Sequence, residues 1–296
     1  MRRVIKLLGG AVVGLCANVT LAGTDLSQSV TGSVSDGSAS LPYRLFEPSG
    51  TTPGQKLPLV LFLHGMGERG TDNVKQTTWM SGLVHATQGG QYASYVLAPQ
   101  IDTSGWFQSF SSKPTESMSL TIKALKQVMS SENVDTSRVY VTGLSMGGMG
   151  TWDIVGREPK LFAAAVPMSG GGDKRTAEAV KDTPIWAFHG GADPIVSVDD
   201  TRSMIDAVRA AGGSPRYTEI AGAGHEIWNQ VYGDASNTLY PWLFAQSRDG
   251  TSSALSEAAP VESAMVAAPD AVPEPGTVGV LVIVAGAALG RRSRRA

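Results

Sequence analysis

Short apolar runs alternate with amphipathic segments along most of this chain. Residues 57–63 form a continuous apolar run, which is typical of a strand buried on both faces of a sheet. Residues 119–130 instead place Ile122, Leu125 and Val128 on one stripe, which predicts a helix. We predict strands at residues 43–46, 57–63, 95–98, 139–142, 163–167, 184–188 and 217–220, and helices at 119–130, 147–158 and 201–211.

The alternation of strands and helices indicates the fold class. Strands that are separated by helices usually form a mostly parallel sheet with helices on both faces, so we expect an α/β fold. Residues 27–42, before the first regular alternation, are expected to form an antiparallel edge or a loose arm.

The N-terminus has the pattern of an export signal. A basic start with Arg2, Arg3 and Lys6 precedes an apolar stretch at residues 7–21 and a small residue, Ala22. We interpret residues 1–22 as a signal peptide that signal peptidase removes; a membrane anchor is the alternative. The single cysteine, Cys16, falls inside this segment, so the mature chain is expected to have none.

The C-terminus carries a second targeting pattern. Residues 248–271 are rich in Ala, Ser, Pro and Glu and are expected to be a flexible linker, which leaves residues 23–247 for the folded domain. Residues 272–296 hold a Pro-Glu-Pro motif, an apolar stretch and an arginine cluster. This segment resembles a PEP-CTERM sorting signal, with an ordinary C-terminal anchor as the alternative.

Targeting of this kind implies both a location and processing partners. The resemblance implies an exosortase-type processing enzyme and transient insertion into the inner membrane. The positive-inside tendency keeps the arginine cluster in the cytoplasm. We therefore expect the domain to be exported, and to be periplasmic, on the cell surface or extracellular after processing.

Composition narrows the function classes only slightly. A net charge of −2, with 17% charged and 42% hydrophobic residues, is ordinary for a globular enzyme. The basic clusters lie at the two ends, where targeting explains them, so we expect no nucleic-acid partner.

A G-x-S-x-G motif at residues 143–147 follows a predicted strand and precedes a predicted helix. In that context the serine lies on a sharp turn, which makes Ser145 a candidate nucleophile and the amide of Met146 a candidate oxyanion donor. The motif alone is weak, because a chain with 35 glycines can show it by chance.

A glycine-rich loop follows the strand at residues 57–63 and contains His64, Gly65 and Met66. Such a loop can supply the second backbone donor of an oxyanion hole, so Met66 is our candidate. A tight turn that only ends the strand is the alternative interpretation.

An acid and a histidine follow the serine in the order expected for a catalytic triad. Asp193 lies after the strand at residues 184–188, and His225 lies in a glycine-bracketed loop after the last strand. The competing acids are Asp199, Asp200, Glu226 and Asp234. Asp199 and Asp200 fit a helix start better, and Glu226 is adjacent to His225 and cannot easily reach its ring. The remaining histidines fit other roles: His64 and His189 close strands and are expected to be structural or to orient loops, and His85 has no motif around it.

Together these segments resemble secreted α/β-hydrolases of the predicted-peptidase and polyhydroxybutyrate-depolymerase or feruloyl-esterase type. The run at residues 64–73 (HGMGERGTDN) is the most specific part, and the similarity spans roughly residues 30–247. The resemblance implies that Ser145, Asp193 and His225 form the triad, that Met66 and Met146 form the oxyanion hole, and that Gln100, Trp106 and Trp228 line the mouth. It also suggests that Glu68 and Arg69 form a pair that braces the glycine-rich loop beginning at His64, which is called the oxyanion loop below.

The expected activity is acyl transfer to Ser145 without a metal or other cofactor. Our first hypothesis is a secreted carboxylic ester hydrolase, of the phospholipase/carboxylesterase or feruloyl/acetyl esterase kind, acting on a small or polysaccharide-linked ester. A serine peptidase of prolyl-oligopeptidase style is the second, although such enzymes generally add a filter domain that is not visible here. A surface-displayed binding protein without turnover is the third.

Overall fold

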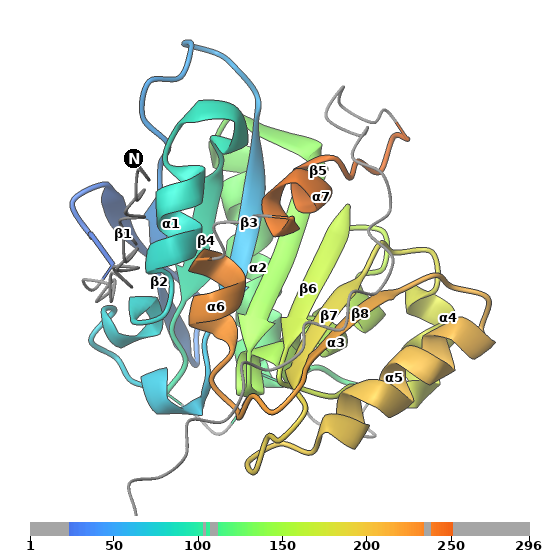
Figure 1. Ribbon diagram of the computed structural model, residues 1–296. Coiled ribbons are helices and arrows are strands. Elements are labelled where there is room, and N and C mark those ends of the chain that lie inside the picture. The colour runs from blue at the N-terminus through green and yellow to red at the C-terminus, as the bar shows by residue number, and fades with distance from the viewer. Residues whose placement is uncertain (1–23, 103–104, 107–111, 234–237, 251–296) are drawn as a thin grey trace, which may run out of the picture. The chain divides into compact units, whose positions relative to one another are not determined.

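The apolar runs form the strands of a central sheet in the computed structural model, which describes residues 24–102, 105–106, 112–233 and 238–250 (Figure 1). Within these ranges the sheet has eight strands, in the order β1-β2-β4-β3-β5-β6-β7-β8. Their bounds are β1 Ser29–Ser35, β2 Ser40–Phe46, β3 Leu57–Leu63, β4 Tyr95–Pro99, β5 Val134–Leu144, β6 Ala164–Met168, β7 Trp186–Gly190 and β8 Arg216–Ile220.

Six of these strands run parallel to one another, from β4 through β3, β5, β6 and β7 to β8. In the centre, Leu61 of β3 is paired with Leu97 of β4 and Val141 of β5. Strands β1 and β2 add an antiparallel edge beside β4. The N-terminal segment is therefore an edge hairpin, the first of the two alternatives, and the predicted α/β architecture is confirmed.

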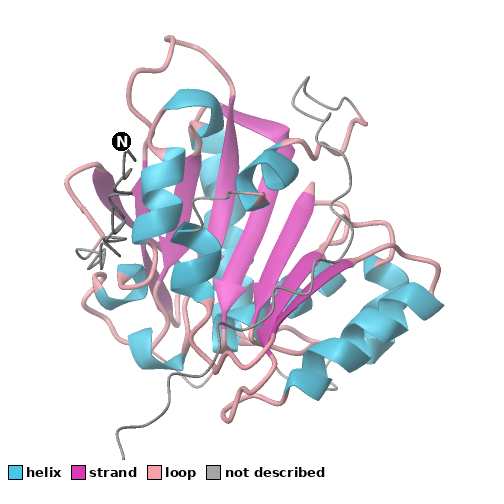
Figure 2. Ribbon diagram, in the orientation of Figure 1, coloured by secondary structure: helices cyan, strands magenta, loops and turns pink. Residues whose placement is uncertain are grey.

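Helices cover both faces of the sheet, so the strands form the middle layer (Figure 2). Helices α1, α6 and α7 pack on one face together with Val60 and Phe62, and α2, α3 and α5 pack on the other with Leu59, Leu61 and Leu63. This alternation along β3 follows from the two-residue period of a strand. The bounds are α1 Ser81–Thr87, α2 Glu116–Ser131, α3 Met146–Arg157, α4 Ala177–Val180, α5 Val198–Ala210, α6 Trp228–Gly233 and α7 Leu239–Phe244, with short 3-10 helices at Met66–Glu68, Lys75–Thr77, Gly90–Tyr92 and Lys174–Thr176.

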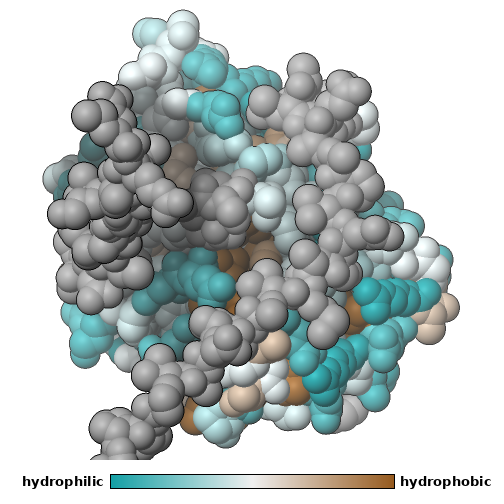
Figure 3. Space-filling view, in the orientation of Figure 1, coloured by the Kyte–Doolittle hydropathy of each residue, from teal (hydrophilic) through white to brown (hydrophobic). Residues whose placement is uncertain are grey.

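The two longest helices, α2 and α5, begin at side-chain caps. The Thr115 hydroxyl accepts a hydrogen bond from the Met118 N–H at 3.0 Å, and the Ser197 hydroxyl accepts one from the Asp199 N–H at 3.3 Å. Asp199 is therefore at the start of α5, as the sequence predicts. The outer face of α5 is hydrophilic (Figure 3), whereas Met204 and Val208 are buried against the sheet.

The two targeting segments lie outside the described residues. The predicted signal peptide (1–22), the predicted sorting signal (272–296) and all but residues 248–250 of the predicted linker are in the part that the structure does not describe. In the part that it does describe, no helix has the length and apolar character needed to cross a membrane.

The first turn of α3 approaches the strand ends so closely that only glycine fits. A Cβ on Gly147 would overlap the carbonyl group of Leu63 and would lie 2.7 Å from the carbonyl oxygen of His64. Both obstacles are backbone atoms of β3 and its loop, which cannot move away as the end of a side chain could.

We therefore expect Gly147→Ala to lower the free energy of unfolding by about 3 kcal/mol or more, because it forces α3 away from the sheet. Gly67→Ala is the matched control, since a Cβ there meets nothing within 4 Å. Urea unfolding followed by circular dichroism measures both variants. Equal stability of the two variants would show that the contact between α3 and β3 is loose.

Candidate active site

Ser145 lies on a strained turn between β5 and α3. Its φ and ψ angles are 55° and −119°, in a region that non-glycine residues rarely adopt. Hydrogen bonds on both sides hold the turn: the Ser145 N–H donates to the Met168 carbonyl at 2.9 Å, and the Met149 N–H donates to the Ser145 carbonyl at 3.0 Å. The side chain is partly exposed at the carboxyl ends of the parallel strands.

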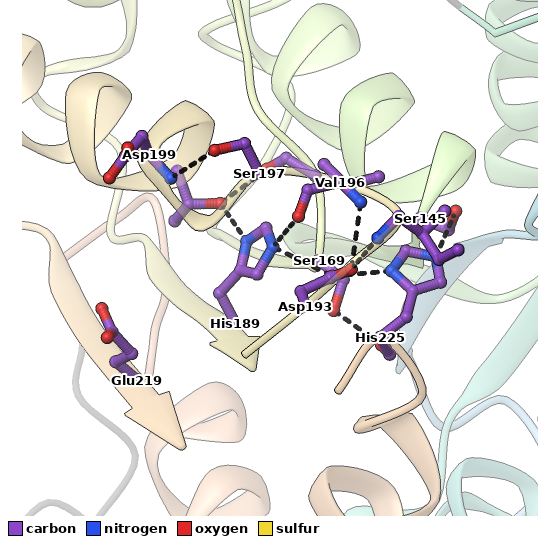
Figure 4. A network of polar contacts seen from close by, with 12 residues as sticks. Ser145, Ser169, His189, Asp193, Val196, Ser197, Asp199, Glu219 and His225 are labelled. Carbon is purple, nitrogen blue, oxygen red and sulfur yellow. Dashed lines mark hydrogen bonds and ion pairs between the residues drawn. The ribbon is translucent and has the colours of Figure 1, made fainter. Parts of the chain in front are cut away.

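Three side chains from distant segments meet at this turn (Figure 4). The Nε2 atom of His225 lies 2.9 Å from the Oγ atom of Ser145, and its Nδ1 atom lies 2.7 Å from Oδ2 of Asp193. Because Oδ2 can only accept, Nδ1 carries the proton and Nε2 is left to accept the proton of the serine. The structure thus brings together the three residues predicted as the triad; their catalytic roles stay a prediction.

Asp193 is fully buried but has several donors around its carboxylate. The N–H groups of Ile195 and Val196 donate to Oδ1 at 2.8 and 3.0 Å. Burial raises the pKa of Asp193, but the hydrogen bond from His225 and these two N–H groups outweigh burial and lower the pKa below its ordinary value. Asp193 is therefore an anion at neutral pH.

His225 is held at its backbone and at its ring as well. The hydroxyl of Ser169, the residue after β6, donates to the His225 carbonyl at 3.0 Å. The ring of Trp228 meets the imidazole edge to face, with ring centroids 5.4 Å apart. Only 14% of the His225 side chain is exposed, so its orientation is restricted before any substrate arrives.

The amides of Met66 and Met146 occupy places where a helix leaves its N–H groups without a partner. Met146 is the first residue of α3 and Met66 is the first residue of a short 3-10 helix. The Nδ1 atom of His64 lies 2.6 Å from the carbonyl oxygen of Gly65, which can only accept, so Nδ1 donates. Because a peptide group is planar with its C=O and N–H opposed, this bond also directs the Met66 N–H.

His64 is a neutral donor in a buried position. Its other nitrogen, Nε2, accepts a hydrogen bond from the Ile101 N–H at 3.2 Å. Burial is the main reason that the pKa of His64 falls to about 4; the bond to Gly65 opposes the shift, and the charge of Arg69 adds to it. The expectation that His64 is a loop-orienting residue thus has a specific geometric basis.

Gln100 and Trp106 do not lie where the resemblance placed them. Gln100 is 1% exposed; its Oε1 accepts from the Asn73 N–H at 2.6 Å and its Nε2 donates to Glu68 O and Asp72 Oδ1, both at 3.1 Å. Trp106 is fully buried and donates to the His64 carbonyl at 2.9 Å. Both side chains support the oxyanion loop from beneath, so the expectation that they line the mouth is wrong for this structure.

Trp228 is close to the site but is also buried. Its side chain is 3% exposed, packs edge to face on Trp79 and contacts His225, so it supports the histidine rather than forming an open wall. Its buried Nε1 atom has no hydrogen-bond partner among the described residues. Trp228 therefore lies beside His225 but does not present an exposed surface at the mouth.

Glu68 and Arg69 each brace the oxyanion loop, but through separate contacts. Oε1 of Glu68 accepts from Trp79 Nε1 at 2.9 Å, and Nε of Arg69 donates to the Met66 carbonyl at 3.0 Å. No ion pair joins the two side chains within the described ranges.

The described part of the chain has no group of three or more His, Cys, Asp or Glu side chains that could hold a metal ion.

The low pKa of His64 predicts a pH dependence of stability. In the unfolded chain this histidine binds a proton near pH 6.5, whereas in the folded chain it does so only near pH 4. The contribution of neutral His64 to the free energy of unfolding is therefore fully present above pH 6.5 and is lost as the pH falls towards 4. Between pH 7 and pH 5 the wild type should lose about 2 kcal/mol more of its free energy of unfolding than His64→Asn.

Urea titrations of both proteins at pH 7 and pH 5 measure this difference. The asparagine keeps a donor near the position of Nδ1 but does not titrate. Parallel losses in the two proteins would contradict a neutral, buried His64.

Comparisons with known proteins agree with this architecture. A bifunctional acetylxylan esterase/xylanase of Neocallimastix patriciarum is 26% identical over 165 residues, which are 56% of this chain and 23% of that protein. A poly(3-hydroxyalkanoate) depolymerase of Paucimonas lemoignei is 31% identical over 157 residues, or 45% of this chain and 36% of that protein. The chain thus spans about a quarter to a third of the length of these two relatives.

A solved structure of a thermostable esterase is also similar. It is 36% identical, with a TM-score of 0.68, over 75% of this chain and 64% of that one. The sheet order described above is therefore that of an α/β-hydrolase with esterase relatives. The model of the dienelactone hydrolase family matches residues 90–237, which are half of the chain and include Ser145, Asp193 and His225, so the chain belongs to that family.

Proposed function

We propose that this protein is a secreted serine hydrolase that cleaves carboxylic esters through an acyl-enzyme on Ser145. The observation that carries the proposal is the continuous contact from Ser145 Oγ through His225 to Asp193, at 2.9 and 2.7 Å. A hydroxyl that is bonded to a neutral imidazole, itself bonded to a buried carboxylate, is the arrangement that activates a serine.

In this mechanism Ser145 attacks the ester carbonyl while Nε2 of His225 takes the hydroxyl proton. Asp193 stays ionised and stabilises the imidazolium that forms. The same proton then passes to the leaving alcohol, which departs and leaves the acyl group on Ser145. Water attacks that ester in the second half of the cycle, with His225 again acting first as base and then as acid.

The amides of Met66 and Met146 are the donors for the oxyanion that develops at each step. They come from two elements, the oxyanion loop and the first turn of α3, and each element donates one N–H to the carbonyl oxygen of the substrate. The helix adds its own dipole, because its positive end points towards the same place. Such a donor typically contributes about two to three orders of magnitude to the rate.

An ester of modest size, attached to a small molecule or to a polysaccharide, is the substrate class we favour. Support comes from the relatives, one of which is named as an acetylxylan esterase and another as a polyester depolymerase. Export fits such polymeric substrates, and the terminal sequence patterns support it. Exposed apolar side chains at Met66 and Ile195, in the two loops that carry the oxyanion donor and the acid, suit an acyl group or an aromatic alcohol.

The proposal predicts that Ser145→Ala abolishes ester hydrolysis while the protein stays folded. The purified wild type and the variant are compared on p-nitrophenyl acetate, p-nitrophenyl butyrate, methyl ferulate and a proline-containing peptide anilide. We expect wild-type turnover of the esters and a loss of kcat of about three orders of magnitude or more in the variant.

The panel also separates the alternatives. Turnover of the anilide alone would replace the esterase by a peptidase. A folded wild type that turns over none of these substrates and is not labelled by a fluorophosphonate would leave the displayed binding protein as the better hypothesis.

A further inference from the structure

A second histidine, His189, lies directly against the acid of the proposed triad. It belongs to β7 and precedes Asp193 by four residues, and both side chains are completely buried. Its Nε2 atom lies 3.1 Å from Oδ2 of Asp193 and 3.1 Å from the carbonyl oxygen of Val196 (Figure 4). One carboxylate oxygen therefore faces two imidazoles, one on the serine side and one beneath it.

The partners of His189 determine which nitrogen carries its proton. A carboxylate oxygen and a carbonyl oxygen can only accept, so Nε2 must be protonated. The other nitrogen, Nδ1, lies 2.7 Å from the Thr201 hydroxyl, which can donate or accept.

The surroundings of Thr201 permit either role. Its hydroxyl lies 3.0 Å from the Gly170 carbonyl, but that carbonyl also accepts from Trp152 Nε1 at 3.1 Å. The Thr201 proton can therefore point to Gly170 or to His189 without leaving a buried carbonyl unpaired. Whichever way it points, the N–H at Nε2 of His189 is bonded to the Val196 carbonyl, and Nε2 lies 3.1 Å from Oδ2 of Asp193.

The bond to Val196 gives this N–H a second effect on Asp193. Val196 and Ile195 donate their own N–H groups to Oδ1 of Asp193, and the Val196 carbonyl is the acceptor for His189. The His189 ring thus holds the turn whose N–H groups bind Oδ1, and the same ring lies against Oδ2. A carboxylate restrained in this way can offer Oδ2 to His225 in one orientation only.

From this geometry we propose that His189 is a positioning residue for the reaction, acting on Asp193 and through it on His225. The inference rests on the proposed function, because it assumes that Asp193 is the acid of the triad. His189 touches neither the substrate nor Ser145. Its effect is on how often the carboxylate, and hence the imidazole of His225, is aligned for proton transfer.

Two substitutions separate the contact to the acid from the contact to Thr201. The side-chain amide of His189→Asn reaches the position of Nδ1, near Thr201, and lacks a donor towards Asp193. The longer side chain of His189→Gln places its NH₂ group near the position of Nε2 and keeps that donor. The pair is closely matched in polarity and differs in which contact survives.

We expect His189→Asn to lower kcat for p-nitrophenyl acetate by about 10- to 100-fold with a much smaller change in KM, because the hydrogen bond to Val196 and the close contact with the charged Asp193 are both lost. His189→Gln should recover most of kcat. The second-order rate of labelling by a fluorophosphonate should follow the same order, because it reports the activation of Ser145 directly. Thermal unfolding of each variant shows that it is folded.

The outcomes decide between this inference and the proposed function. Wild-type kcat in His189→Asn, equal losses in both variants, or a change in KM alone would overturn the positioning role. If Ser145→Ala keeps the activity, the proposed function itself fails. If Ser145→Ala is inactive and both His189 variants are fully active, only the role of His189 is rejected.

A measurement on the wild type tests the proposal even if a variant does not fold. Long-range ¹H–¹⁵N correlation spectra of ¹⁵N-histidine-labelled protein show which imidazole nitrogens carry a proton. With assignment by comparison with His64→Asn, His85→Gln and His225→Gln, Nε2 of His189 should be protonated at neutral pH. A His189 that is protonated only at Nδ1 would contradict the proposal.

Discussion

The close approach of α3 to the ends of β3 and β6 is the constraint on which the site depends. The Ser145 N–H is bonded to the last residue of β6, and Gly147 faces the carbonyls of Leu63 and His64 so tightly that a methyl group has no room. This contact fixes three things together: the strained angles of Ser145, the direction of the helix dipole, and the position of the Met146 amide relative to the Met66 amide. If it loosened, the serine could relax to ordinary backbone angles and would turn away from His225.

Three side chains around this contact, those of His64, Asp193 and His225, each have a defined protonation state. His64 is neutral and donates at Nδ1, Asp193 is ionised and surrounded by donors, and His225 donates at Nδ1 and accepts at Nε2. In a low-dielectric interior an unpaired polar group is costly, and the same condition makes a satisfied network rigid. The protonation pattern of the site is therefore set by the fold before a substrate binds.

Sequence could predict the sheet, the serine turn and which three side chains meet at it, because each depends on local rules. The sequence itself shows the apolar run of β3, the glycines around Ser145, and the order in which Asp193 and His225 follow the serine. Exposure is not visible in this way. Gln100 and Trp106 look like surface recognition residues, but loop packing determines that their polar atoms are used internally. The short helices α1, α6 and α7 have too few residues to show a clear period, and α1 has no side-chain cap.

The site also shows a gradient of burial that suits its chemistry. Asp193 and His189 are fully buried, His225 is slightly exposed, and Ser145 is partly exposed at the strand ends. Burial strengthens the interaction between the carboxylate and the imidazole where charge separation must be stabilised, and it excludes water that would compete for Oδ2. Under the proposed function, exposure at Ser145 lets a substrate carbonyl reach the proposed nucleophile and the two candidate amide donors. A parallel sheet supplies this gradient directly, because the acid is anchored at the end of a strand while the serine stands on the turn above it.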